Sequence, residues 1–291
     1  MKIAHLILAH KAPAQLERLA RALAHPQAAV FIHLDRKTDI RPFAAVAALP
    51  GVWFVRRRFE VTWGGYSLTE ATLEAMREIL QAPAHYDLIN LISGEDYPIK
   101  PAAAIHDFFA RHPGRSFVEY FSSGSAWWQA NESRVSRYHF TDLRFPGQYA
   151  VQNVLNKVLP RRHLPEFDTL HGGNMGGWYT LTRACAAHAV RFVDEHPALQ
   201  RFARLTWGSD EYLVPTILLH SPLADTITND NQRYIDWSGG GSNPKILTIG
   251  DLPALEATPK LFARKFDSQR DAAVLDELDR LHLTAPPPTS W

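Results

Sequence analysis

Apolar residues follow two alternating patterns along the chain. Short and wholly apolar runs, such as residues 2–10 and 87–93, are typical of strands buried on both faces of a parallel sheet. Between these runs, apolar residues recur at helical spacing, as in residues 14–23 and 68–80. Strands that alternate with helices predict an α/β fold with a doubly wound, mostly parallel sheet flanked by helices. Further strands are predicted over residues 28–35, 52–55, 116–120, 226–237 and 260–267, and further helices over residues 102–111, 149–158, 185–205 with a break at Pro197, 207–219, 251–257 and 274–281, before a frayed end at 286–288.

No internal repeat and no linker divides the chain, so we expect one domain over residues 1–291. Residues 121–175 change in character toward aromatic residues, Ser, Arg and Gly. A stretch of this length is usually functional in a compact domain, which predicts an insertion that receives a substrate. An irregular surface excursion is the alternative, and both readings stay open at this point.

The predicted helix over residues 207–219 carries the first chemical signal. Ser209 is placed to act as its N-cap, Asp210 and Glu211 fall in the first turn, and the rest is almost wholly apolar. A helix that is apolar on all sides is buried, and the start of a helix favours ionised carboxylates. Glu211 is therefore predicted as a general base that takes a proton from a hydroxyl. The alternative is that Asp210 and Glu211 only complement the helix dipole.

Polar residues gather where the predicted strands end. His10, Asp35 and Asp96 follow three of these strands, and Trp63 and Gly64 follow a fourth. In a doubly wound sheet, ligands bind beyond the carboxyl ends of the strands. A carboxylate after the second strand can accept from a ribose hydroxyl or a base N–H. The glycine allows close approach of the backbone to a ligand, or it makes a tight turn. Neither a Gly-x-Gly-x-x-Gly nor a Walker A sequence occurs, so dinucleotide and P-loop binding are unsupported.

Cations near the end of the chain predict a site for a diphosphate. Arg264 and Lys265 lie between Phe262 and Phe266, and Lys245 follows a glycine-rich loop. Fixed cations can neutralise a diphosphate leaving group. The chain contains no Asp-x-Asp, the acidic pair that holds a divalent cation on a diphosphate, so the basic side chains would do that work without a metal. A solvated edge strand is the alternative for Arg264 and Lys265.

Composition limits partners and location. The net charge of +1 gives no strong attraction to nucleic acid, and no nucleic-acid partner is expected. The one cysteine, Cys185, excludes an intramolecular disulfide framework. The apolar start of the chain is too short for a signal sequence, and no apolar run approaches the roughly 20 residues that span a bilayer. We therefore expect a cytoplasmic protein without a transmembrane segment, for which peripheral membrane association stays open.

Eight short motifs occur in order along the chain: AHK at 9–11, IHLDRK at 32–37, WGGYS at 63–67, SGEDYPIK at 93–100, GGW at 176–178, DEY at 210–212, RYIDW at 233–237 and FARKFD at 262–267. Together they resemble the core-2/I-branching β-1,6-N-acetylglucosaminyltransferase and peptide O-xylosyltransferase family over nearly the whole chain. The resemblance implies a GT-A fold, an inverting mechanism, a UDP-sugar donor, no other cofactor and no metal. It divides the domain into a nucleotide-binding half (1–120), an acceptor-side insertion (121–175) and a catalytic and diphosphate-binding half (176–291).

The resemblance also implies roles for individual residues. By position, Glu211 corresponds to the catalytic base, Arg264 and Lys265 to the diphosphate-binding cations, and Asp35 to the carboxylate near the uridine. The family's xylosyltransferases carry an Asp where this chain has Gly177, which argues against xylose as donor and a peptide as acceptor. The full expected donor site comprises His10, Asp35, Trp63, Gly64, Lys245, Arg264 and Lys265, and the expected acceptor or sugar pocket comprises Asp96, Gly177, Trp178, Asp210 and Arg233.

The expected function is transfer of a GlcNAc- or xylose-like sugar from a UDP-sugar to a hydroxyl of a glycan acceptor, in bacterial cell-surface polysaccharide synthesis. A glycoside hydrolase is one alternative, because it could pair Glu211 with Asp96. A non-catalytic glycan-binding protein is the other, supported by the tryptophan content.

Overall fold

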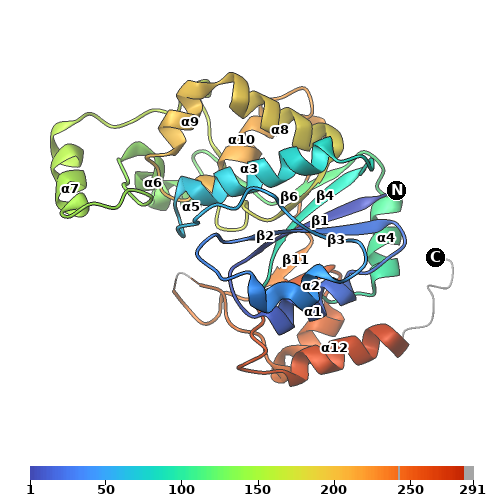
Figure 1. Cartoon of the computed structure of the whole chain (residues 1–291). Coiled ribbons are helices and arrows are strands. Elements are labelled where there is room, and N and C mark those ends of the chain that lie inside the picture. Colours follow the sequence, from blue (N-terminus) through green and yellow to red (C-terminus); the bar gives the residue numbers. More distant parts are fainter. Residues whose placement is uncertain (242, 285–291) are drawn as a thin grey trace. The chain divides into compact units, whose positions relative to one another are not determined.

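A computed structural model describes residues 1–241 and 243–284 as two compact units, each built from separate stretches of the chain. The first unit takes residues 1–56 and 85–114 and continues from Gln232, and the second takes residues 57–84 and 115–231 (Figure 1). The single domain expected from the sequence stays a prediction. The frayed end expected at 286–288 lies outside the described residues.

Four parallel strands form the core of the first unit in the order β4-β1-β2-β3. Buried apolar residues fill the two central strands, as their continuous apolar sequence predicts. Helices of the same unit lie beside this sheet (Figure 1). The strands are β1 (Ile3–Ala9), β2 (Ala28–Leu34), β3 (Val52–Phe54) and β4 (Leu88–Ser93), and the helices are α1 (Pro13–Ala22), α2 (Ala44–Ala47), α4 (Ala102–Ala110), α11 (Leu252–Ala257) and α12 (Ala273–Thr284), with 3-10 turns η1 (Arg41–Phe43) and η4 (Ile249–Asp251).

A small second sheet in this unit carries Arg264, one of the predicted diphosphate cations. Its central strand, β12 (Phe262–Arg264), runs parallel to β11 (Arg233–Ile235) and antiparallel to β5 (Asp96–Pro98). The sequence pattern missed β5, because three residues that include a proline give no strand periodicity.

The second unit contains three neighbouring strands in the order β10-β6-β9, a separate two-stranded pair and most of the described helices. Strand β6 (Ser116–Val118) is parallel to β10 (Ile227–Asn229) and antiparallel to β9 (Tyr179–Thr182), while β7 (Phe121–Ser122) pairs with β8 (His171–Gly172). The helices are α3 (Tyr66–Gln81), α5 (Ala126–Asn131), α6 (Ser133–Ser136), α7 (Gln148–Val158), α8 (Arg183–Glu195), α9 (Pro197–Ala203) and α10 (Leu213–Leu219), with 3-10 turns η2 (Ser209–Glu211) and η3 (Ala224–Thr226).

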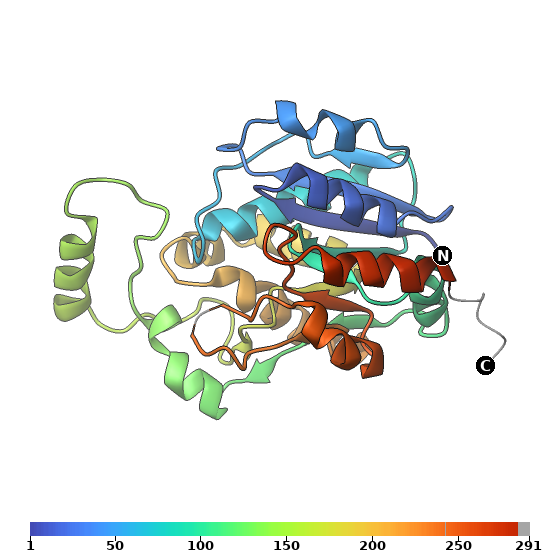
Figure 2. The same cartoon turned by 90° about the horizontal axis from the view of Figure 1, so that it is seen from below.

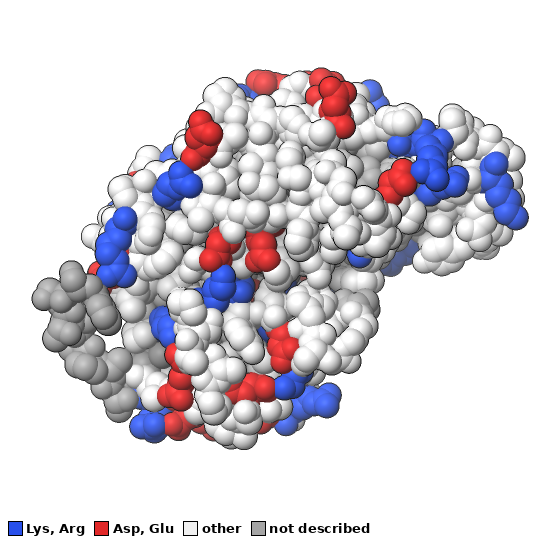
Figure 3. Space-filling view, turned by 180° about the vertical axis from the view of Figure 1, so that it is seen from behind, with Lys and Arg blue, Asp and Glu red and all other residues white. Residues whose placement is uncertain are grey.

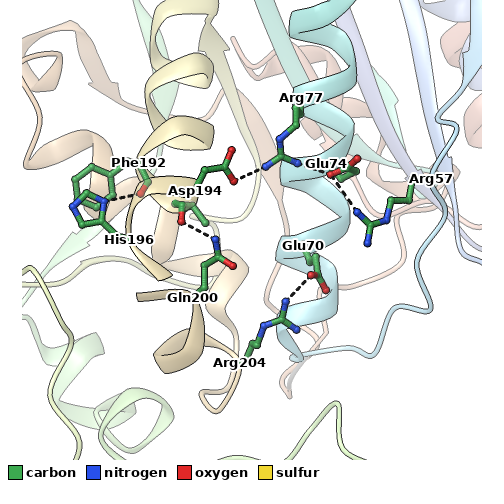
Figure 4. A network of polar contacts seen from close by, with 10 residues as sticks. Arg57, Glu70, Glu74, Arg77, Phe192, Asp194, His196, Gln200 and Arg204 are labelled. Carbon is green, nitrogen blue, oxygen red and sulfur yellow. Dashed lines mark hydrogen bonds and ion pairs between the residues drawn. The ribbon is translucent and has the colours of Figure 1, made fainter. Parts of the chain in front are cut away.

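Ion pairs hold α3 to α8 and to the residue after α9 (Figure 4). Arg77 of α3 donates to Asp194 at 2.7 Å, and Arg204 donates to Glu70 at 2.7 Å. The same helix α3 presents the buried hydroxyl of Thr69 to Ser209. The buried hydrogen bond between Thr69 and Ser209 therefore ties the turn that carries Glu211 to α3.

The predicted fold class is confirmed: the structure is α/β, with mostly parallel strands flanked by helices. The predicted break at Pro197 is also confirmed, since α8 ends at Glu195 and α9 begins at Pro197. The single strand predicted over 226–237 is wrong. Gln232 has a φ of 62°, which interrupts the extended backbone and leaves β10 and β11 as separate strands.

The surface mixes charges of both signs. On the face shown in Figure 3, Lys and Arg side chains lie among Asp and Glu side chains. This distribution agrees with the net charge of +1.

Candidate active site

Glu211 ends the 3-10 turn η2, which precedes the buried helix α10. The prediction that Ser209 caps this helix is wrong. Its hydroxyl bonds instead to the hydroxyl of Thr69 at 2.7 Å, and Tyr212 separates the turn from α10. Gly208, with a φ of 70°, reverses the chain just before the turn. The turn thus fixes Glu211 without a side-chain cap.

The carboxyl of Glu211 is partly withdrawn from water, with 19% of its side chain exposed. Burial and the neighbouring Asp210 raise its pKa to about 7, against the opposing effect of Arg134. Arg134 Nη1 donates a hydrogen bond of 2.5 Å to Glu211 Oε2. The sequence predicts an ionised carboxylate at a helix start, whereas the structure gives a carboxyl that titrates near neutral pH. Such a group is well matched to accept a proton from a hydroxyl.

Two glycines bring a neighbouring loop onto the backbone of this turn. A Cβ on Gly172 would lie 2.2 Å from the carbonyl oxygen of Glu211, and one on Gly176 would lie 2.4 Å from it. The N–H of Gly173 donates to the same oxygen at 3.1 Å. Only glycine allows this approach, so the loop and the turn are positioned together.

Gly177 lies beside the second carboxylate of the turn. A Cβ on Gly177 would lie 3.2 Å from Asp210 Oδ2. A carboxylate side chain at position 177 would therefore meet Asp210. Trp178 directly precedes β9 and is half-buried.

Trp63 and Gly64 pack against Trp207, which lies just before the turn η2. The Trp63 ring meets Trp207 edge to face with centroids 4.9 Å apart, and a Cβ on Gly64 would lie 2.6 Å from the Trp207 indole nitrogen. Gly208 donates to the Gly64 carbonyl at 2.8 Å. The Trp207 ring in turn lies 4.3 Å from the guanidinium of Arg134. Trp63 and Gly64 thus support the surroundings of Glu211.

The predicted cations of the first unit begin on β12. Phe262 and Phe266 are fully buried, so they anchor the segment as expected. Arg264 Nε lies 3.3 Å from Asp96 Oδ1, and the two residues pair across β12 and β5. Asp96 is itself fully buried and accepts from the backbone and hydroxyl of Ser93 at 3.0 and 2.7 Å. Asp96 therefore orients Arg264.

Lys265 belongs to a charged cluster around Glu95. Lys265 Nζ lies 3.6 Å from Glu95, and Lys11 Nζ lies 2.7 Å from it. Burial alone would raise the pKa of Glu95, but the hydrogen bond from Lys11 and the charges of Lys265 and Arg264 outweigh it and lower that pKa. An incoming phosphate would compete with Glu95 for these cations.

A cavity of about 180 Å³ lies at the carboxyl ends of β1 and β4 and is lined by His10, Lys11 and Glu95, among others. Burial lowers the pKa of His10. The charge of Lys11 lowers it further, and the charges of Glu95 and Asp35 oppose the shift without cancelling it. Because β4, β1 and β2 are neighbours, the polar residues that follow them collect at one edge of the sheet. The order of these three strands agrees with the predicted gathering, and the binding of a ligand by these residues stays a prediction.

Asp35 and Lys245 are held by local partners. Asp35 accepts from the backbone N–H of Lys37 at 2.8 Å. Lys245 Nζ donates to Asp251 at 2.5 Å, and this bond raises the pKa of Lys245. The N–H of Lys265 points to the Lys245 carbonyl at 3.5 Å, so the structure brings these two predicted cations onto neighbouring backbone segments.

Arg233 lies in the core of the first unit. Its guanidinium donates to Asn90 Oδ1 at 2.5 Å and to the Leu91 carbonyl at 2.8 Å, and lies over the Phe262 ring. These contacts favour a structural role, and its predicted contact with a sugar stays a prediction. The first unit thus holds His10, Asp35, Asp96, Arg233, Lys245, Arg264 and Lys265, and the second holds Trp63, Gly64, Gly177, Trp178, Asp210 and Glu211.

Sequence reasoning did not assign Arg134 as the partner of Glu211, or Glu95 and Lys11 as partners of Lys265. Arg134 stands 77 positions before Glu211. Its position among aromatic residues of the predicted insertion was the only signal in the sequence that pointed to it. Glu95 and Lys11 stand next to predicted residues, so their positions at strand ends were the available signal.

Among residues 1–241 and 243–284, no group of three or more His, Cys, Asp or Glu side chains is arranged to hold a metal ion. Within the same ranges, no helix combines the length and the apolar character needed to cross a membrane.

Comparison with known proteins gives one matching family model and several similar proteins. Residues 3–263 match the family model described as Core-2/I-Branching enzyme. The chain is similar to xylosyltransferase oxt of Drosophila melanogaster, at 25% identity over 96% of this chain and 33% of that protein. It is similar to xylosyltransferase 2 of Homo sapiens, at 26% identity over 99% of this chain and 35% of that protein. The chain therefore spans about a third of the length of these relatives. The apo crystal structure of mouse xyloside xylosyltransferase 1 aligns with a TM-score of 0.40 and 13% identity, over 90% of this chain and 97% of that chain.

Proposed function

Because the chain belongs to the Core-2/I-branching enzyme family, we propose that it is an inverting, metal-independent glycosyltransferase. It transfers a GlcNAc- or xylose-like sugar from a UDP-sugar to a hydroxyl of a glycan acceptor, in bacterial cell-surface polysaccharide synthesis. Similarity to xylosyltransferases supports the xylose-like donor, and Gly177 beside Asp210 favours the GlcNAc-like one. One observation carries the proposal: Glu211 is a carboxyl with a pKa of about 7, rigidly held and hydrogen-bonded to Arg134.

In the proposed reaction, ionised Glu211 takes the proton of the acceptor hydroxyl as that oxygen attacks the anomeric carbon. The new glycosidic bond forms on the face opposite the departing UDP, which inverts the configuration. Arg134 limits the rise of the Glu211 pKa, so that a large fraction of the carboxyl is ionised at neutral pH.

The diphosphate leaves as an anion and needs positive charge. Arg264, Lys265 and Lys245 supply it from fixed positions on and beside β12. His10 and Asp35, at the ends of β1 and β2, are proposed to contact the nucleoside. The buried carboxylate of Asp96 keeps Arg264 in place.

The test is UDP release by the purified chain from a panel of UDP-sugars with oligosaccharide acceptors. Glu211→Gln keeps the shape of the side chain but cannot take a proton, so transfer should fall by on the order of 10² or more while UDP binding is kept. Glu195→Gln, at an exposed carboxylate of α8, is the matched control and should transfer at the wild-type rate. Wild-type transfer by Glu211→Gln would refute the assignment.

A glycoside hydrolase that pairs Glu211 with Asp96 is less well supported. Asp96 is fully buried and accepts two hydrogen bonds from Ser93, so its carboxylate is committed to the protein. Hydrolysis of glycans without a UDP-sugar would revive that alternative.

We further propose that the protein works in the cytoplasm, since its one cysteine, Cys185, is fully buried as a free thiol.

A further inference from the structure

Helix α7 (Gln148–Val158) turns its polar side inward and its apolar side outward, the reverse of an ordinary surface helix. Gln152 Oε1 accepts from the backbone of Phe140 at 2.8 Å, and Gln148 donates to the Phe140 carbonyl at 3.3 Å. Asn156 bonds to both backbone groups of Tyr138 at 2.8 Å. Gln148, Gln152 and Asn156 recur every four residues on one side, so hydrogen bonds attach that side of the helix to the protein.

The opposite side of α7 is open to solvent. Val151, Val154 and Val158 are 44%, 58% and 70% exposed, and at about 100° per residue they share one face. Figures 1 and 2 both show α7 standing apart from the other helices of its unit.

Exposed apolar side chains concentrate in this part of the molecule. Of the twelve large apolar side chains that are exposed in the described residues, seven lie between positions 143 and 159. A concentration of this kind marks an interaction surface rather than chance exposure. We call this exposed segment the α7 surface; it comprises the valine face of α7 (Val151, Val154 and Val158) together with Leu143, Phe145, Tyr149 and Leu159, which lie near it in the chain.

Every Lys, Arg, Asp or Glu within the segment that carries the α7 surface, residues 143–165, is basic. Residues 143–165 contain Arg144, Lys157, Arg161 and Arg162 and no Asp or Glu. Arg162 donates to the carbonyls of Leu205 and Phe202, which fixes the segment to its unit. Lys157, Arg144 and Arg161 are exposed.

Two of these cations have exposed partners. Arg161 pairs with Glu132 at 2.8 Å, and Arg144 lies 3.9 Å from Glu60. Exposed pairs of this kind are worth little, so each cation can exchange its carboxylate for another anion.

We propose that the α7 surface docks the protein on a membrane of anionic lipid, with α7 lying in the plane of the interface. The valines enter the boundary between headgroups and acyl chains, and Lys157, Arg161 and Arg144 meet lipid phosphates. A second copy of the chain fits less well, because two α7 surfaces face to face would bring like charges together.

The first test is sedimentation of the full chain with vesicles of phosphatidylcholine, alone or mixed with phosphatidylglycerol. The wild-type chain should bind the mixed vesicles at least tenfold more strongly than the neutral ones. Val154→Glu combined with Val158→Glu should lose at least tenfold of that binding. The matched control, Ile40→Glu combined with Trp53→Glu, makes the same charge change at exposed apolar residues elsewhere and should bind as wild type.

A second measurement places the helix at the lipid. Cys185 is fully buried, so Val154→Cys offers one accessible thiol for a polarity-sensitive fluorophore. Its emission should shift to the blue with phosphatidylglycerol vesicles and stay unchanged with phosphatidylcholine alone. All these variants should keep the wild-type unfolding temperature, since the altered side chains are exposed.

Three results would overturn the proposal. One is a wild-type chain that does not bind the mixed vesicles, and another is equal binding by the Val154→Glu and Val158→Glu variant. The third is a wild-type dimer in solution that this variant converts to a monomer, which would assign the α7 surface to a second copy.

Discussion

At the scale of single residues, the titration of Glu211 decides when the proposed enzyme works. Its pKa of about 7 means that the carboxyl is protonated, and cannot accept a proton, in acid. The transfer rate should therefore rise with pH to a plateau above about 7, and should fall about tenfold per pH unit well below it. Rates measured across this range with saturating substrates give the apparent pKa.

Arg134 provides the internal control for that profile. Its charge lowers the pKa of Glu211, so Arg134→Gln should move the acid limb of the profile to higher pH. Arg134→Lys keeps the positive charge and should move the limb less. An unchanged limb in Arg134→Gln would mean that another group controls the rate.

The cation of Lys265 should matter for the diphosphate and not for the nucleoside. Lys265→Met removes one charge-assisted contact, so the affinity for UDP should fall about tenfold or more, while that for uridine stays the same. Calorimetric titration with both ligands separates the two effects. Lys2→Met removes an exposed cation of the same unit and should leave both affinities unchanged. Equal losses for UDP and uridine would contradict a phosphate contact.

At the scale of elements, the loop before β9 packs directly against the backbone of the turn η2, because glycines in this loop have no side chain. A Cβ on Gly176 would lie 2.4 Å from the Glu211 carbonyl oxygen, so Gly176→Ala must displace the turn. We expect a loss of about 1–3 kcal/mol of unfolding free energy and a larger loss of transfer rate. Denaturant unfolding and UDP release measure the two quantities.

Gly250→Ala is the control for that experiment. Its nearest contact would be Thr248 Oγ1 at 3.7 Å, an ordinary van der Waals distance. If Gly176→Ala were as stable and as active as Gly250→Ala, the loop would not position Glu211.

The main elements could be predicted because they are periodic. The strands β1, β2 and β4 are continuous apolar runs, and α3 repeats its buried residues at helical spacing. The short strand β5 and the turn η2 were not predictable in this way, since three residues carry no period. Their conformation depends on partners far along the chain: β12 for the strand and Thr69 for the turn.

The candidate site divides in the same manner. Residues at strand ends, such as His10 and Asp35, could be placed from the order of strands alone. Arg134 could not be assigned to Glu211, because no local pattern links residues so distant in sequence. The raised pKa of Glu211 depends on the burial of its carboxyl and on Asp210. How far a single carboxyl is buried depends on the three-dimensional packing around it, and the sequence pattern does not give this.

At the scale of the whole molecule, the proposed reaction balances the charge of the departing diphosphate with basic side chains. Arg264, Lys265 and Lys245 carry it permanently, so turnover should not need a divalent cation. We expect equal rates of UDP release in excess EDTA and in added Mn²⁺ or Mg²⁺. A metal-dependent glycosyltransferase assayed in parallel should lose its activity in EDTA, which confirms that chelation is complete. If EDTA abolished turnover by this chain and Mn²⁺ restored it, the basic side chains would not suffice for the leaving group, and the proposed mechanism would need a metal that these residues alone do not replace.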